Sequence, residues 1–488
     1  MTRAENWNLV LQLCKESQDD VIDCLRIELL NDFGKVEEFS RGSNMRHLAS
    51  CFRSFLPRRK REKIPPATRH KPVIFFPATS GSNLLNLLPV AREARHRDLL
   101  GGIVAGEAVQ RGNPEAFDEF FPVVHERTLN AQLGIGFLAG SFQRARRRLG
   151  RMIKWLHQRD AHCARRVRQN YGSYLRLMVT AERSQIVCRN LLSTWQPSCI
   201  LTTSDFYPFE FQFIWQAGKM GIPTSILQHG EPNDVVVWPT YADTFLAWGE
   251  SYREQLLKLG APENRLHVTG MPASDALFLR ASGTESTTSR KNTPVCLVLS
   301  HTQDRIEDSA LFEEYGRCLT EAIRSTPGMK WKIKLHPSED DSFYQEHAIN
   351  DLAQVEILRR EVSLEKAVDQ SDVVCTIRST AGLQAMMMQK PVIVLYLAAL
   401  AGPPVTWPLH GGGTFARHAE EFLSNLNRLI SEDTFLHSIL VKQRQFLDLK
   451  FANRGKAASA IVDFLQNQTT PCEPRTTKII QHYARNTI

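Results

Sequence analysis

The sequence lacks the signals of a secreted or membrane-spanning protein. It has no run of about 18 consecutive apolar residues, the length from which a membrane-spanning helix is suspected. Residues 1–13 are amphipathic and mixed in charge, with no basic segment followed by an apolar one. We therefore expect a cytoplasmic protein.

Regularly spaced cysteines are also missing. None of the ten cysteines forms a C-x-x-C pair, and several lie in apolar runs such as VCLVL and DVVCTI. This usage argues against a zinc site or a disulfide framework and indicates reduced cysteines that act as small core residues.

Motifs that read nucleic acids or hold metals are absent as well. We find no zinc finger and no RRM-like aromatic motif, so nucleic acid is not an expected partner. No Asp-x-Asp stands at an expected strand end, and Asp340 and Asp341 fall in an expected exposed loop. We expect no catalytic metal and no cofactor.

What is present indicates a globular protein of two domains. The chain of 488 residues is long for one compact domain, and its 42% hydrophobic and 23% charged residues are ordinary values. A Ser/Thr-rich stretch without an apolar face is typical of a linker. We expect a helical extension and linker over 1–69, a first domain over 70–280 with a basic helical insertion at about 141–195, the linker over 281–293, a second domain over 294–467, and a tail over 468–488.

Strands and helices alternate in both domains. Short apolar runs at 73–77, 200–202, 294–300 and 390–396 are separated by segments with helical patterns, and helices are expected at 420–430 and 434–465. Apolar strands that alternate with helices predict parallel sheets covered on both faces. We predict an α/β fold of the GT-B type, with two Rossmann-like domains that face a cleft.

A candidate phosphate site lies in the second domain. Arg378, Ser379 and Thr380 form the turn between the strand DVVCTI and a helix. Hydroxyl groups, free backbone N–H groups and an Arg at a helix start suit a phosphate. An ordinary capped helix explains the same pattern.

Two neighbouring strand ends add donor-site candidates. His336 and Pro337 follow the strand in WKIKLHP, where an imidazole can donate to a phosphate or ribose, and Lys334 precedes them. Ser300 opens the loop after the first strand of the domain. We expect these residues to bind the donor nucleotide.

The first domain contributes a small-residue loop and two titratable candidates. The loop that follows the strand at 73–77 is expected to contact an acceptor or phosphate and contains Ser80, Gly81, Ser82 and Asn83. His229 lies just beyond another strand, and a neutral imidazole there can take a proton from a hydroxyl group. Asp205 is a competing base or the residue that orients His229. Gln228 and Glu231 flank the turn, and we expect them, like the small-residue loop, to contact the acceptor or a phosphate.

Positive charge is concentrated in one segment. Between Arg144 and Arg168 there are ten Lys or Arg residues and a single acid, Asp160. A basic amphipathic helix of this kind can lie on an anionic membrane, although a solvated helix face accounts for it equally well.

The ordered series QHG, ADTFLAWG, RLHVTGMPASD, KLHP and TIRSTAGLQAMMMQKPVI resembles bacterial surface-polysaccharide transferases of GT-B form. These include CDP-glycerol glycerophosphotransferases, capsule transferases, and bacterial sialyltransferases and polysialyltransferases. The resemblance covers residues 73–465 and is best over 202–396. It implies a donor cytidine nucleotide held by His336–Pro337 and Ser379–Thr380, with His229 as the base.

Two departures from these families leave the donor sugar open. The acidic D/E-D/E-G motif of several sialyltransferases is missing. The residues Thr376 to Ser379 stand where the glycerophosphotransferases have Asp-Tyr-Ser-Ser.

The resulting hypothesis is a metal-independent transferase of capsule or surface-polysaccharide synthesis at the inner face of the membrane. It would move a glycosyl or glycerophosphate group from a CMP- or CDP-linked donor to a glycan or lipid-linked acceptor. The alternatives are a UDP-sugar 2-epimerase of the same architecture, and a non-catalytic GT-B scaffold that binds membrane or glycan.

Overall fold

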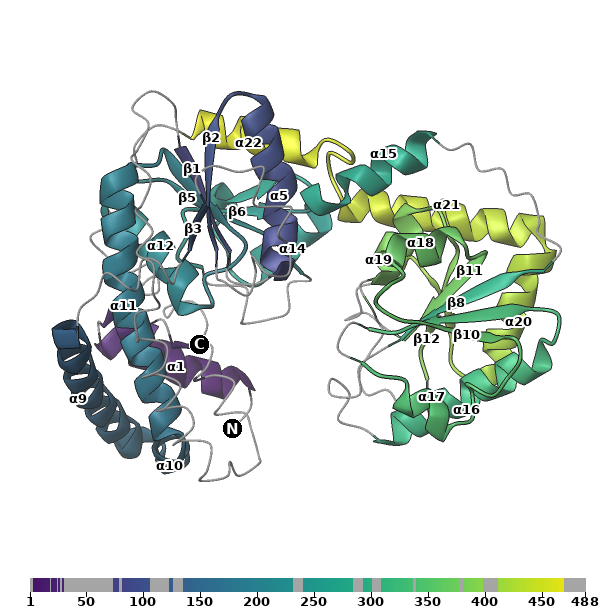
Figure 1. The fold of residues 1–488 in the computed structure, drawn as a ribbon, viewed down its shortest axis with the longest axis horizontal. Helices are drawn as coiled ribbons and strands as arrows, with labels where there is room; N and C mark the ends of the chain where they lie inside the picture. Colours follow the sequence, from purple (N-terminus) through teal and green to yellow (C-terminus); the bar gives the residue numbers. More distant parts are fainter. Residues whose placement is uncertain are drawn as a thin grey trace. The chain divides into compact units, whose positions relative to one another are not determined.

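The computed structural model describes residues 3–17, 19–23, 25, 26, 29, 73–78, 81–105, 123–125, 135–230, 240–283, 293–300, 309–336, 339–377, 379, 381–397 and 411–468. The chain forms two compact units (Figure 1). The first unit comprises Met1–Ala273 with Lys456–Ile488, and the second comprises Ser274–Gly455.

The first unit is built on a sheet of seven strands in the order β3-β2-β1-β4-β5-β6-β7, and every neighbouring pair is parallel. Every residue of β4, β5 and β6 is buried, as expected for strands covered on both faces. The strands are β1 (Val73–Ala78), β2 (Leu100–Ala105), β3 (Val123–His125), β4 (Cys199–Thr202), β5 (Thr224–Leu227), β6 (Thr244–Ala247) and β7 (Leu266–Val268). The short strand β3 was not predicted from the sequence.

Helices cover this sheet and form the basic insertion. They are α1 (Arg3–Ser17), α2 (Asp20–Asp23), α5 (Gly81–His96), α9 (Ile135–Arg159), α10 (Ala161–Gln169), α11 (Tyr171–Trp195), α12 (Pro208–Lys219), α14 (Glu250–Lys258) and α22 (Ala457–Asn467), with the 3-10 turns η1 (Glu263–Arg265) and η2 (Pro272–Ser274), the second of which crosses into the second unit. The N-terminal helices dock on the unit, since Val10, Leu13 and Leu25 are buried. Among the described helices, none is both long enough and apolar enough to cross a membrane.

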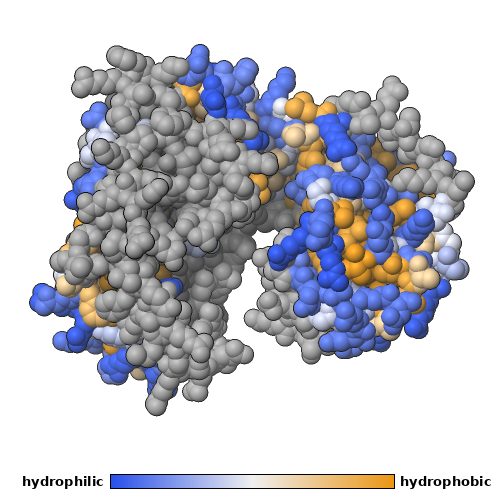
Figure 2. All heavy atoms as spheres, in the orientation of Figure 1, coloured by the Kyte–Doolittle hydropathy of each residue, from blue (hydrophilic) through white to orange (hydrophobic). Residues whose placement is uncertain are grey.

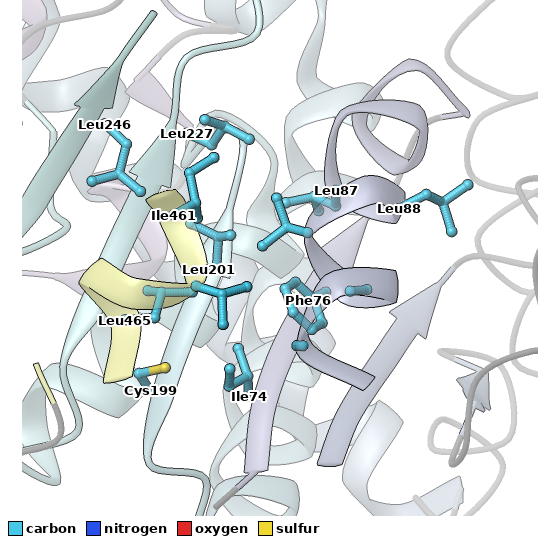
Figure 3. Close-up of a cluster of buried hydrophobic side chains, with 14 of the residues drawn as sticks. Ile74, Phe76, Leu87, Leu88, Cys199, Leu201, Leu227, Leu246, Ile461 and Leu465 are labelled. Carbon is cyan, nitrogen blue, oxygen red and sulfur yellow. The ribbon is translucent and has the colours of Figure 1, made fainter. Parts of the chain in front are cut away.

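The C-terminal helix α22 completes the core of the first unit. Its Ile461 and Leu465 pack with Leu201, Leu227 and Leu246 from three strands of the sheet (Figure 3). The sequence had indicated one helix over 434–465 within a second domain of 294–467. The structure instead divides this helix around Gly455 and returns α22 to the first unit. Helical periodicity predicts an apolar face but not the sheet that will cover it.

The second unit contains six strands in the order β10-β9-β8-β11-β12-β13, again all parallel. These are β8 (Val295–Leu299), β9 (Lys330–Lys334), β10 (Val355–Leu358), β11 (Val373–Thr376), β12 (Val392–Leu395) and the unpredicted short edge strand β13 (Thr414–Ala416). Its helices are α15 (Asp275–Gly283), α16 (Ser309–Ser325), α17 (Ser342–Glu346), α18 (Leu364–Asp369), α19 (Ala381–Met387), α20 (Ala419–Ser431) and α21 (Asp433–Lys450). The expected linker 281–293 lies mostly outside the described residues.

Candidate functional site

The strand order of the second unit defines where a ligand can bind. From β8 the chain proceeds to β9 and β10 on one side, whereas β11 begins the other side. Ligands of open parallel sheets bind at such a switch point, beyond the carboxyl ends of the strands. Ser300 directly follows β8 and Ser379 follows β11, so the structure brings two predicted donor-site residues to this switch point.

A network at this edge joins Ser300, His336 and Glu339. The backbone N–H of His336 donates to Ser300 Oγ at 2.8 Å and to Glu339 Oε2 at 3.2 Å. The Ser300 hydroxyl in turn donates to Glu339 Oε2. The loops after β8 and β9 are therefore tied together by one carboxylate.

Glu339 was not among the predicted site residues. It is half-buried, and desolvation raises the pKa of its carboxyl group, although the hydrogen bonds from Ser300 and His336 oppose the rise. The fully buried Tyr315 and Tyr344 lie near it, and burial raises the pKa of both phenols. Carboxyl groups whose pKa is raised by burial are common at functional sites, and Glu339 lies at the carboxyl edge of the sheet, where ligands bind. The sequence signal was weak, because Glu339 follows the His-Pro turn directly beside the solvent-facing Asp340.

The remaining donor-site predictions divide into three cases. Lys334 Nζ donates to the carbonyl oxygens of Leu335 at 3.3 Å and Arg359 at 3.0 Å, so it braces the ends of two strands. Ser379 Oγ accepts from the backbone N–H of Ala381 at 3.2 Å, as a helix-capping residue does. Pro337, Arg378 and Thr380 lie outside the described residues.

The first unit has its own switch point, between β1 and β4. His229 follows the neighbouring strand β5 and contacts Phe206, with ring centroids 6.0 Å apart. The surrounding protein lowers the pKa of His229 by desolvation, while a hydrogen bond to the Thr203 backbone opposes the shift. Because the imidazole is also exposed to solvent, this lowering is limited in size. The imidazole is therefore neutral at neutral pH, as a base must be.

Asp205 does not orient His229. Its Oδ1 lies 2.7 Å from Arg26 Nη2, and both side chains are almost fully buried. Its Oδ2 accepts from Thr240 Oγ1 at 3.1 Å and from the backbone N–H of Tyr241 at 2.8 Å. With both oxygens engaged, the carboxylate holds the N-terminal segment to the loop after β4, and its expected role as a base has no structural support.

Gln228 is likewise used within the fold. Its side-chain oxygen accepts from the backbone N–H of Trp248 at 2.9 Å, and its amide nitrogen donates to the carbonyl oxygen of Gly230 at 2.9 Å. It therefore links the ends of β5 and β6. Gly81, Ser82 and Asn83 form the first turn of α5, with Asn83 buried. Ser80 and Glu231 lie outside the described residues.

Two buried hydroxyl groups beside His229 were also missed from the sequence. Thr203 and Ser204 follow β4 and are almost fully buried, and in the described part of the chain their hydroxyls have no hydrogen-bond partner. Buried hydroxyls normally find a partner, so these two are candidates to bind hydroxyl groups of a ligand.

One group of side chains has the composition of a metal site. Ligand atoms of Asp160, His162 and Cys163 lie within 4.8 Å of one another. However, Asp160 Oδ1 already accepts from the Cys163 backbone N–H at 2.8 Å as the N-cap of α10, and arginines surround the turn. These features favour a helix cap over a cation site.

Comparison with known proteins gives a partial family match and several structural neighbours. The sequence model of the UDP-N-acetylglucosamine 2-epimerase family matches residues 236–397, about a third of the chain. No curated protein matches the sequence.

Among solved structures, the chain is similar to UDP-GlcNAc 2-epimerase from Neisseria meningitidis bound to UDP-GlcNAc, with 15% identity and a TM-score of 0.54 over 82% of this chain and 100% of that one. A putative UDP-N-acetylglucosamine 2-epimerase from Listeria monocytogenes gives 14% identity and a TM-score of 0.55 over 83% and 99% of the two chains. A glycosyltransferase from Rickettsia africae gives 12% identity and a TM-score of 0.51 over 82% of this chain and 99% of that one.

These matches overturn the hypothesis of a CMP- or CDP-linked transferase. Both the family model and several structural neighbours are UDP-GlcNAc 2-epimerases, which was the alternative interpretation of the sequence. The predicted architecture is confirmed: the chain has a GT-B-like fold of two parallel-sheet α/β domains with a helical N-terminal region.

Proposed function

We propose that the protein is a nucleotide-sugar enzyme that inverts carbon 2 of a UDP-N-acetylhexosamine. The observation that carries this proposal is the epimerase-family match over residues 236–397. That segment contains the ends of β8, β9 and β11, and with them Ser300, Glu339 and Ser379. The region of family likeness therefore includes the switch point at which a parallel sheet binds its ligand.

The chemistry requires two kinds of site. The nucleotide is held at the second unit by Ser300, His336 and Ser379, with the neighbouring candidates Lys334, Pro337, Arg378 and Thr380. Inversion at carbon 2 requires a base that removes its proton while the released electron pair expels UDP from carbon 1, and an acid that returns a proton to the opposite face as UDP adds back at carbon 1. His229, neutral at neutral pH, suits the first role, and the Thr203 and Ser204 hydroxyls suit contacts with the sugar.

The direct test supplies UDP-GlcNAc alone, without any acceptor, in D2O. We expect conversion to the carbon-2 epimer, approach to the same mixture from either sugar, and deuterium at carbon 2 in both, as followed by proton NMR. Absence of both interconversion and deuterium exchange contradicts the proposal.

A His229→Gln variant refines the test. We expect at least a hundredfold lower rate, within the range of about 10²–10⁴ for loss of a general base. The wild-type rate should fall as the pH drops below about 6.5, the ordinary pKa of His, because the lowered pKa of His229 places its protonation there. Lys258→Gln, an exposed change on α14, serves as the control.

A protein that binds nucleotide sugars without turning them over is the second candidate. The observation in its favour is that Asp205, the carboxylate at the end of β4, is neutralised by Arg26. Binding of UDP-GlcNAc in calorimetry, with neither epimerisation nor deuterium exchange, would support this reading.

A further inference from the structure

The structure divides nine of the ten basic residues of Arg144–Arg168 into two sets, and the tenth, Arg166, is buried. The inward set makes ion pairs inside the first unit. Arg148 binds Asp19 at 2.6 Å, and Arg159 binds Glu16 at 2.8 Å. Arg144 binds Glu182 at 2.9 Å. Part of the positive charge thus serves to hold the N-terminal segment and helix α11.

Glu182 shows that the inward pairs are structural. Desolvation alone would raise its pKa, but hydrogen bonds from Arg144, Ser141 and Arg148 outweigh this effect and lower it. The carboxylate is therefore charged and compensated inside the fold. Arg148 is partly buried by this contact, whereas the Arg144 side chain stays 49% exposed while it pairs with Glu182.

The outward set has no such compensation. Its members are exposed, and in the described part of the chain none makes an ion pair or a hydrogen bond. The set consists of Arg146, Arg147, Arg151, Lys154, Arg165 and Arg168.

Their spacing places five of the six outward residues on a shared face of their own helix, and Arg146 lies beside that face of α9. Arg147, Arg151 and Lys154 are four and three residues apart on α9, and Arg165 and Arg168 are three apart on α10. Such positions share a helix face. The opposite face of α9, with Leu149, Met152 and Leu156, is buried. Hydrophilic side chains lie at the lower left edge of Figure 2, where Figure 1 places α9 and α10.

We propose that the outward set binds the surface of an anionic lipid bilayer. Three uncompensated cations on one face of α9 and two on one face of α10 offer positive charge to a plane of negatively charged headgroups. Contacts to single-stranded nucleic acid also need exposed aromatic rings for base stacking. Of the aromatic side chains of α9, Trp155 donates to Glu16 at 2.6 Å and lies under Arg159, and Phe137 lies under Arg144. Among the residues of α9 and α10 whose burial is described, no large apolar side chain is exposed, so the contact is electrostatic and shallow.

The test uses the full chain and sedimentation with vesicles of phosphatidylcholine, with or without phosphatidylserine. The variant carries Arg147→Gln, Arg151→Gln and Lys154→Gln. Its matched control removes the same charge elsewhere on the first unit, by Arg95→Gln, Arg189→Gln and Lys258→Gln. Each Lys or Arg near an anionic membrane surface contributes about fivefold in affinity. We therefore expect the triple variant to bind phosphatidylserine vesicles on the order of a hundredfold more weakly.

We expect the control to bind like the wild type, raised salt to release both, and pure phosphatidylcholine to bind neither. Equal loss in variant and control would mean that only net charge matters, and would overturn the proposal. Stronger binding to single-stranded RNA than to phosphatidylserine vesicles at equal salt would also overturn it. Turnover of UDP-GlcNAc plays no part in this assay, so its outcome is independent of the proposed activity.

Discussion

At the scale of single residues, Glu339 is the carboxylate that joins the predicted donor-site residues Ser300 and His336 of the second unit. It accepts from Ser300 and from the His336 backbone, and burial disfavours its charged form. A carboxylate in this position lowers the stability of the folded protein when it is ionised, because it is less well solvated there than in water.

Replacement of Glu339 by Gln separates stability from function. Since the folded-state pKa is raised, the folded protein holds more protons than the unfolded chain just above pH 4.5, and wild-type stability falls as the pH rises through that window. Gln does not titrate. We therefore expect the variant to gain stability relative to wild type between pH 4 and pH 7.5, measured by urea unfolding, while UDP-GlcNAc binding weakens about tenfold or more. Equal loss of stability at both pH values would contradict this.

The Arg26–Asp205 pair is the second residue-scale feature with a measurable consequence. Arg26 also lies over the rings of Phe211 and Tyr241, at 5.5 and 4.9 Å from their centroids. Arg26→Met leaves the Asp205 charge buried without its partner. We expect a loss of about 3–5 kcal/mol in the free energy of unfolding.

The double variant Arg26→Met with Asp205→Asn provides the control, because it removes both charges and keeps an acceptor for Tyr241. It should recover a large part of the loss in urea unfolding. Additive losses in the double variant would show that the two charges do not interact.

At the scale of elements, the break between α21 and α22 decides which sheet the last helix covers. Gly455 has a φ of +76° there, and an added Cβ would lie 3.0 Å from Leu279 Cδ2. Gly455→Ala should therefore lower the free energy of unfolding by about 1–3 kcal/mol through backbone strain and crowding.

Gly150, inside α9, has open space where an added Cβ would lie. Gly150→Ala should instead stabilise the protein by up to about 1 kcal/mol. Thermal unfolding should show a lower melting temperature than wild type for Gly455→Ala and a higher one for Gly150→Ala.

The element scale also shows what the sequence could predict. Apolar runs bounded by polar loops located most strands, and the strand ends led directly to Ser300, His336, Ser379 and His229. Strands β3 and β13 are three residues long and carry too little pattern to detect. The partner of Asp205 could not be inferred, because Arg26 is distant in the sequence and only folding brings the two together.

At the scale of the whole molecule, the fold was predictable and the nucleotide was not. The resemblance to GT-B transferases depended on turns at strand ends, and parallel sheets with different ligands share such turns. Three of the predicted donor-site residues, Pro337, Arg378 and Thr380, also lie outside the described residues. The architecture was therefore confirmed, whereas the CMP- or CDP-linked donor was wrong.

Buried thiols offer a test of how the whole molecule unfolds. Seven described cysteines are buried and free, and burial raises the pKa of Cys199 and Cys318 to about 12. Thiolate is the reactive form, so these residues should resist iodoacetamide in the native protein. In rising urea, we expect mass spectrometry to show Cys199 and Cys318 labelled as the first and second unit unfold, respectively. Labelling of either without denaturant would contradict their burial.

The return of α22 to the first sheet also fixes an order of events during synthesis. The strands of the first unit leave the ribosome early, but Leu201, Leu227 and Leu246 lack their cover until residues 457–467 have emerged. The second unit, which is continuous in sequence, can close while the first still exposes apolar surface. We therefore expect the nascent chain to expose apolar surface of its earliest-made unit for a long interval, which ends only when α22 emerges.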